Sequence, residues 1–93
     1  MTVSSPKISV SYDRNSDVLY IALGKAVPAK TRHDDRGLAF RFAVEDGHPC
    51  GVTIMGYKAD HWIDNIRDLA NIIGGKLHIQ NATVLTALEN IKA

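Results

Sequence analysis

The stretch Leu38-Ala-Phe-Arg-Phe-Ala-Val-Glu-Asp-Gly47 has the most regular pattern in the chain. Every second side chain from Leu38 to Val44 is large and apolar, and a period of two indicates a strand with one face in the core. Asp46-Gly47 is a strong hairpin signal, and residues 50–57 alternate again after it. The stretch therefore predicts two antiparallel neighbouring strands.

Three more short strands are expected upstream of this pair. Residues 7–12 alternate between polar and apolar side chains, whereas residues 18–23 are apolar on both faces and suit a central strand. Residues 29–33 are polar and follow Pro28, which suits an edge strand. Five short strands joined by short turns predict an antiparallel β-meander.

The period changes to three and four from residue 60. Trp62, Ile66, Leu69 and Ile73 form one apolar stripe, which predicts an amphipathic helix. Gly74-Gly75 should end this helix in a left-handed C-cap.

A second helix is expected at the end of the chain. Asn81 is a good N-cap, and the apolar stripe comprises Val84, Leu85, Leu88 and Ile91. Residues 76–80 are interpreted as a connector or a sixth short strand. Both helices should cover the same face of the sheet.

These elements predict one α+β domain over residues 1–93. It has an antiparallel β-meander of five strands, or six, over residues 8–57, and a helical extension over 60–92. Phe40 and Phe42 should enter the core beneath the first helix. Their expected neighbours are Ile8, Val10, Val52 and Ile54 in the sheet, and Trp62 and Ile66 in the helix.

Composition restricts the functional classes. The chain has 93 residues, is 45% hydrophobic and 23% charged, and has a formal net charge of +1, which gives no support for a nucleic-acid or membrane-surface role. The apolar run at 18–23 is far shorter than the roughly 20 residues of a membrane span. The N-terminus lacks the regions of a signal peptide, so a cytoplasmic location is expected. Cys50 is the only cysteine.

Several motifs resemble one bacterial family. They are Tyr12-Asp13, the run Asp17-Val-Leu-Tyr-Ile21, the charged turn before Gly37, and Gly51-Val-Thr-Ile-Met55. Together these motifs resemble the family of domains of unknown function 2283, over about residues 8–57. Thr53 stands where members of that family usually have Glu. The resemblance implies a compact β-rich domain, no established activity and no catalytic residue.

Acidic residues in turns are candidate metal ligands. Asp13 and Asp17 flank a tight turn and could chelate a cation, but Asp favours turns for its own backbone hydrogen bonds, and a calcium site needs more oxygen ligands. His33 precedes Asp34 and Asp35, yet consecutive residues of an extended chain point to opposite faces. The sequence therefore predicts turn-stabilising roles and no metal site.

Histidine and cysteine give little support for catalysis. His33, His48, His61 and His78 have no metal-ligand spacing. His48 and Cys50 are the nearest approach to a base and a nucleophile, but Pro49 separates them and no third orienting group is evident. No glycine-rich phosphate loop precedes a helix. No catalytic residue, metal or cofactor is predicted.

Basic residues cluster around the predicted edge strand. A strip of Lys30, Arg32, Arg36 and Arg41, with Tyr57 or Phe42 nearby, could bind nucleic acid. A solvated edge is the favoured interpretation, because the net charge is near zero and aromatic residues are few.

Two functional hypotheses follow. The first is a non-enzymatic protein-interaction module that forms a homodimer or binds a heterologous protein; for such a family an antitoxin-like role is one expectation. Its interface would be a second apolar sheet face, formed by Leu19, Ile21, Leu23, Met55 and Tyr57 beside Ala43. The second is a small-ligand or metal-binding protein, or an enzyme with a site assembled across a dimer. That site would use Tyr12, Asp13, His33 or His48.

Overall fold

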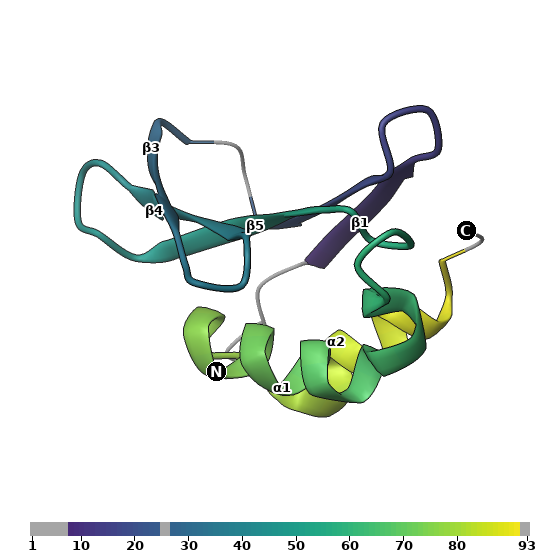
Figure 1. Ribbon diagram of the computed structural model, residues 1–93. Helices are drawn as coiled ribbons and strands as arrows, with labels where there is room; N and C mark the ends of the chain where they lie inside the picture. Colours follow the sequence, from purple (N-terminus) through teal and green to yellow (C-terminus); the bar gives the residue numbers. More distant parts are fainter. Residues whose placement is uncertain (1–7, 25–26, 92–93) are drawn as a thin grey trace.

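One open antiparallel sheet and two helices make up the fold. The computed structural model describes residues 8–24 and 27–91. The strands are β1 (Ile8–Asp13), β2 (Val18–Leu23), β3 (Ala29–His33), β4 (Leu38–Ala43) and β5 (Pro49–Met55), and a 3₁₀ turn η1 (Trp62–Asn65) precedes α1 (Ile66–Leu77) and α2 (Asn81–Glu89). Both helices lie on the same face of the sheet (Figure 1). The predicted α+β class, with five strands and two helices, is confirmed. Lys7, the expected first residue of β1, and Lys92 lie outside the described residues.

The order of the strands differs from a meander. They lie in the order β1-β2-β5-β4-β3, so the chain crosses from β2 to the far edge and returns through β4 to pair β5 with β2. β2 and β5 are the most apolar strands, and inserting the polar β3 between them would bury its charged side chains. β3 is instead an edge strand with every residue exposed, as predicted.

The face that β2 turns toward the helices was predicted wrongly. Four loop residues, 14–17, separate Asp13 from its partner Val18, so Tyr12 is paired with Leu19. Directly opposed residues share a face, and β2 is apolar on both, so the pairing decides which face enters the core. The side chains expected at a subunit interface are therefore core residues. These are Leu19, Ile21, Leu23 and Tyr57, each no more than 9% exposed.

The core lies between the sheet and the helix layer. Phe40 is buried and Phe42 is half-buried against the same cluster, on the predicted face. Trp62 and Ile66 pack on this cluster, as expected. The helices contribute the buried side chains of Leu69, Ile73, Leu77, Val84 and Leu88. None of the helices in the described part of the chain is long and apolar enough to cross a membrane.

The boundary between the two helices also differs from the prediction. α1 continues through Gly74-Gly75 to Leu77, and His78 adopts the left-handed conformation instead. A Cβ atom at Gly74 would overlap the side chain of Asn81 and lie 2.9 Å from the carbonyl oxygen of Ile79. Gly74 thus permits close packing of the interhelical turn. Residues 76–80 are not a strand.

The expected N-cap residue has another role. Gln80 occupies the N-cap position of α2, and Asn81 is its first residue. The side-chain nitrogen of Asn81 donates to the side-chain oxygen of Asn71 at 2.8 Å. Asn81 therefore links α2 to α1 instead of capping α2.

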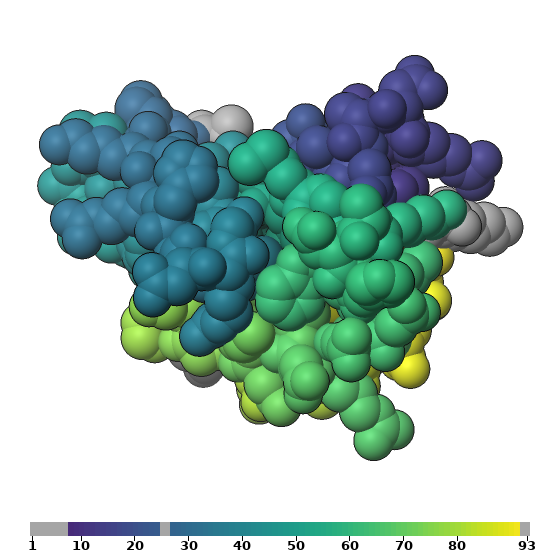
Figure 2. All heavy atoms as spheres, viewed as in Figure 1, coloured from purple at the N-terminus to yellow at the C-terminus, as the bar shows by residue number. Residues whose placement is uncertain are grey.

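The helix layer covers its face of the sheet unevenly. α1 packs on β5 and α2 packs on β1. In the space-filling view the blue atoms of β3 and β4 project beyond the yellow-green end of α1 (Figure 2). No helix from residues 8–24 and 27–91 lies against the opposite face of the sheet (Figure 1).

Candidate functional site

The densest polar cluster is centred on Asp17, at the end of the β1–β2 loop. Asp17 has a φ angle of 56°, a left-handed conformation that Asp adopts more readily than most residues. One carboxylate oxygen accepts hydrogen bonds from the hydroxyl of Tyr12 at 2.6 Å and from the amide of Lys58 at 2.9 Å. The other accepts from the amide of Ala59 at 3.0 Å.

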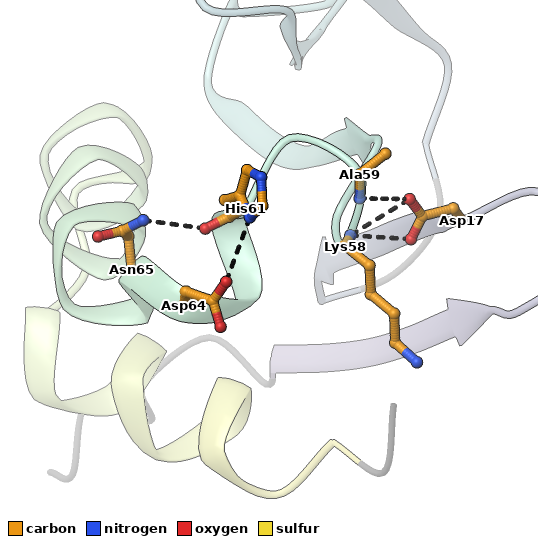
Figure 3. A network of polar contacts seen from close by, with 6 residues as sticks. All are labelled: Asp17, Lys58, Ala59, His61, Asp64 and Asn65. Carbon is orange, nitrogen blue, oxygen red and sulfur yellow. Dashed lines mark hydrogen bonds and ion pairs between the residues drawn. The ribbon is translucent and has the colours of Figure 1, made fainter.

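The main chain of Asp17 holds the same neighbouring segment. Its carbonyl oxygen accepts hydrogen bonds from the amides of Gly56 at 2.9 Å and Tyr57 at 3.2 Å. The Asp17 carboxylate, in the β1–β2 loop, faces the amides of Lys58 and Ala59 in the turn after β5 (Figure 3). A single residue therefore ties the β1–β2 loop to the turn that leads from β5 into the helices.

Tyr12 completes this cluster from β1. Its ring lies 5.6 Å from that of Tyr57, between centroids, at a tilt of 59°, and the ammonium of Lys58 lies 5.9 Å from its centroid. The hydrogen bond to Asp17, helped by desolvation and the carboxylate charge, raises the pKa of Tyr12 to about 12. The same hydroxyl, followed by the amides of Ala59 and Lys58, lowers the pKa of Asp17.

These properties suit a structural role rather than catalysis. A general acid or base works best when its pKa is near the operating pH, and the pKa values of Tyr12 and Asp17 both move away from neutrality. Both Asp17 carboxylate oxygens already accept hydrogen bonds from the chain itself. We therefore assign the Asp17 cluster to loop anchoring.

The turn after this cluster leads into η1. His61 has a φ angle of 64° and is the N-cap of η1, where its ring nitrogen lies 3.3 Å from a carboxylate oxygen of Asp64. The side chain of Asn65 donates to the carbonyl oxygen of His61 at 2.9 Å (Figure 3). All three side chains are exposed, so these contacts shape the turn without enclosing a site.

Asp13 does not converge with Asp17. Its carboxylate accepts the amide of Asn15 at 3.0 Å, which stabilises the β1–β2 loop as expected for a turn residue. The carboxylate of Asp17 is engaged with residues 58 and 59 instead. The two-carboxylate hypothesis finds no shared ligand position here.

Asp34 likewise stabilises a turn. Its carboxylate accepts the amides of Arg36 and Leu38, both at 2.9 Å, and lies 3.4 Å from the guanidinium of Arg36. His33 is exposed on β3 and lies beside this turn. Across residues 8–24 and 27–91, no group of three or more His, Cys, Asp or Glu residues is arranged to hold a metal ion.

His48 and Cys50 also have separate environments. The His48 ring nitrogen and amide both bond to the carboxylate of Asp46, and these bonds lower the pKa of Asp46. Cys50 is 9% exposed, at an irregularity in the β4–β5 pairing. No hydrogen bond joins His48 to Cys50 in the described part of the chain.

The basic strip is divided between the two faces of the sheet. Lys30 and Arg32 are paired with Phe42 and Phe40, so they lie on the helix side. Arg41 lies on the opposite side, where one terminal nitrogen is 3.4 Å from the carbonyl oxygen of Ile21. Its Nε atom is buried, and no described residue accepts a hydrogen bond from it. Apart from an Arg within a strand, no sequence signal points to this unpaired donor.

Comparison with known proteins adds the family. No curated protein and no solved structure matches the chain. A family model described as "Protein of unknown function (DUF2283)" matches residues 9–58, more than half of the chain. The matched segment contains Tyr12 and Asp17, so the motif residues of the resemblance are those that anchor the loops. The chain belongs to the DUF2283 family.

Proposed function

We propose that this domain is a non-catalytic protein-interaction module that forms a homodimer through the open face of its sheet. The observation that carries the proposal is the one-sided helix layer: in the part of the chain that the structure describes, helices lie against only one face of the five strands (Figure 1). A core of this size gains from burying a second sheet face, since small domains bury a modest share of their surface.

The open face combines small and apolar side chains with polar ones such as Ser11, Thr31 and Thr53. Its central positions are small, with Ala39 and Ala43 nearly buried between their neighbours and Gly51 beside them. Tyr20 is 41% exposed and Met55 is 50% exposed on the same face. Aromatic residues and Met are enriched at interfaces, and small side chains allow close approach of another sheet.

Arg41 supports the same surface. Its Nε atom is a buried donor without an acceptor among the described residues, and such a group costs free energy until it is paired. It lies on the open face, because Arg41 is paired with Gly51. An outward turn of the Arg41 side chain on association would bring this donor to a carbonyl or carboxylate oxygen of a second copy.

The size of the face indicates how much of it a dimer must use. Five strands spaced about 4.8 Å apart and about 20 Å long cover roughly 500 Å². Two such faces together bury about 1,000 Å², the lower limit for a specific interface. A homodimer would therefore use the whole face. Symmetric pairing of one patch with itself is the commonest form of assembly.

Sedimentation velocity tests this proposal. We expect a wild-type dimer at micromolar concentration and a monomer for Met55→Asp, because the aspartate would be desolvated at the interface. Thr83→Asp is the matched control, since Thr83 is exposed on α2 and the added charge is the same. A monomeric wild type, or a dimer that Met55→Asp leaves intact, would contradict the proposal.

A further inference from the structure

A groove of about 470 Å³ lies on the helix side of β3 and β4, away from the open face. It exists because α1 packs on β5 and α2 on β1, which leaves the β3–β4 end of the sheet less covered. Figure 2 shows that β3 and β4 extend past the end of α1. The groove is lined by Arg32, His33, Asp34, Phe40, Phe42, Gly47 and Lys76.

The charges around the groove are unbalanced. Arg32 and Lys76 line it, and Lys30 lies on the same face of β3. Within the described residues, none of these three cations has an ion pair or a hydrogen bond to its side chain. Asp34 is the acidic residue of the lining, and its carboxylate is already bonded to the amides of its own turn. The groove therefore favours carboxylates above an apolar floor.

The strand beside the groove has a free edge. The amide of Val44 donates to the carbonyl oxygen of Pro28 at 3.0 Å, so these two residues form a hydrogen-bonded pair. Hydrogen-bonded and non-hydrogen-bonded pairs alternate along an antiparallel ladder. Lys30 and Arg32 are therefore bonded to β4, whereas the amide and carbonyl of Thr31 point away from it. A further strand can pair with these outward groups.

The same charges discriminate between strands. Two copies of β3 pairing edge to edge would bring Lys30 and Arg32 against each other, and like charges in opposed positions repel. Charged side chains on an edge strand protect it in this way against pairing with another copy. An incoming strand with acidic side chains at alternate positions would instead place them opposite Lys30 and Arg32.

We propose that the free edge of β3 binds an extended, acidic segment of a partner protein as a sixth strand. The main-chain groups around Thr31 supply the pairing, and Arg32 with Lys76 selects carboxylates at every second residue. The chain segment is favoured over a small ligand because the groove lies along an exposed strand edge. This surface is separate from the face proposed for dimerisation.

NMR titration of ¹⁵N-labelled full-length protein tests the proposal. The probe is an acetylated, amidated octapeptide in which Glu alternates with Val. One control peptide replaces every Glu with Lys, and another has four Glu followed by four Val. We expect saturable shifts and slower amide exchange at Thr31 with the alternating acidic peptide alone.

Variants separate the main-chain and charge contributions. Thr31→Pro removes one outward amide without touching the β3–β4 ladder, and it should abolish binding. Arg32→Glu should weaken binding by at least about fivefold through loss of attraction and new repulsion. Arg67→Glu is the control for Arg32→Glu, because Arg67 is exposed at the start of α1, away from the groove.

Three outcomes would overturn the proposal. One is equal binding of the acidic and basic peptides, and another is the absence of saturable shifts at millimolar peptide. The third uses benzoate, a small aromatic carboxylate, as a further probe. Chemical-shift changes near Phe42 with benzoate, and none with the peptide, would indicate a small-ligand site. Sedimentation of Arg32→Glu should still report the wild-type oligomeric state, because the Arg32 side chain lies on the helix side of the sheet, so this test is independent of the dimer.

Discussion

Truncation of Ile21 tests the corrected orientation of β2. Ile21 is fully buried, between Val10 on β1 and Val52 on β5. Ile21→Ala removes three carbon atoms, worth about 0.8 kcal/mol each in transfer free energy. The strand ladders on both sides hinder collapse of the site, so the remaining cavity should add about 1–2 kcal/mol. We expect the free energy of unfolding to fall by about 3.4–4.4 kcal/mol.

Urea denaturation followed by the fluorescence of Trp62 measures this loss, because Trp62 packs against the core. A domain of this length has a stability of roughly 5–14 kcal/mol, so the variant should remain folded in the absence of urea. The control is Met55→Ala, which should cost less than about 1 kcal/mol because Met55 is 50% exposed. Both variants should be compared at two protein concentrations, since a dimer adds a concentration-dependent contribution.

A cost below about 1 kcal/mol for Ile21→Ala, together with a larger cost for Met55→Ala, would refute the reasoning. It would mean that the other face of β2 packs against the helices. Equal denaturant slopes for the two variants are required for this comparison, because the slope reports the surface exposed on unfolding.

Three further predictions concern Phe40, Phe42, Asp17 and Tyr12. In urea denaturation, Phe40→Ala should lower the free energy of unfolding by about 3–5 kcal/mol, and Phe42→Ala should lower it clearly less, because Phe42 is half-buried. Equal losses for the two variants would contradict the open groove. The lowered pKa of Asp17 contributes stability that is present above about pH 4 and is lost as the pH falls through the folded-state pKa. The urea midpoint of Asp17→Asn should therefore fall less on acidification than the urea midpoint of the wild type. The raised pKa of Tyr12, about 12, contributes stability that is complete below about pH 10 and is lost as the pH rises toward 12. Thermal melting curves of Tyr12→Phe at alkaline pH should lack this loss of stability. A loss equal to that of the wild type would mean that another group titrates.

The sequence predicted the elements of the fold better than their arrangement. Alternation in β4 and the helical stripe from Trp62 each report one buried face, so both were assigned to the correct side of the core. β2 is apolar on both faces, and its orientation depends on pairing with β1 across a four-residue loop. Strand order failed for a related reason, because adjacent position in the sequence does not require pairing in the sheet.

Long-range contacts explain the rest of the differences. Gly74 resembles a helix terminator, yet it is needed where Asn81 and Ile79 approach α1. Asp17 resembles an ordinary turn residue, but its carboxylate bonds to amides 41 and 42 positions further along the chain. Tyr12 is a ligand candidate by sequence, but its hydroxyl donates a hydrogen bond to the carboxylate of Asp17. Spacing within one loop carries no signal for such contacts.

The open face of the sheet can be tested most directly by NMR on a dimer with one labelled and one unlabelled subunit. Isotope-filtered spectra select nuclear Overhauser effects between subunits. We predict intermolecular cross-peaks from the methyl group of Met55 to protons of the partner subunit's open-face residues. Cross-peaks that connect only the helix layers, or no intermolecular cross-peaks at a concentration where sedimentation shows a dimer, would contradict the account.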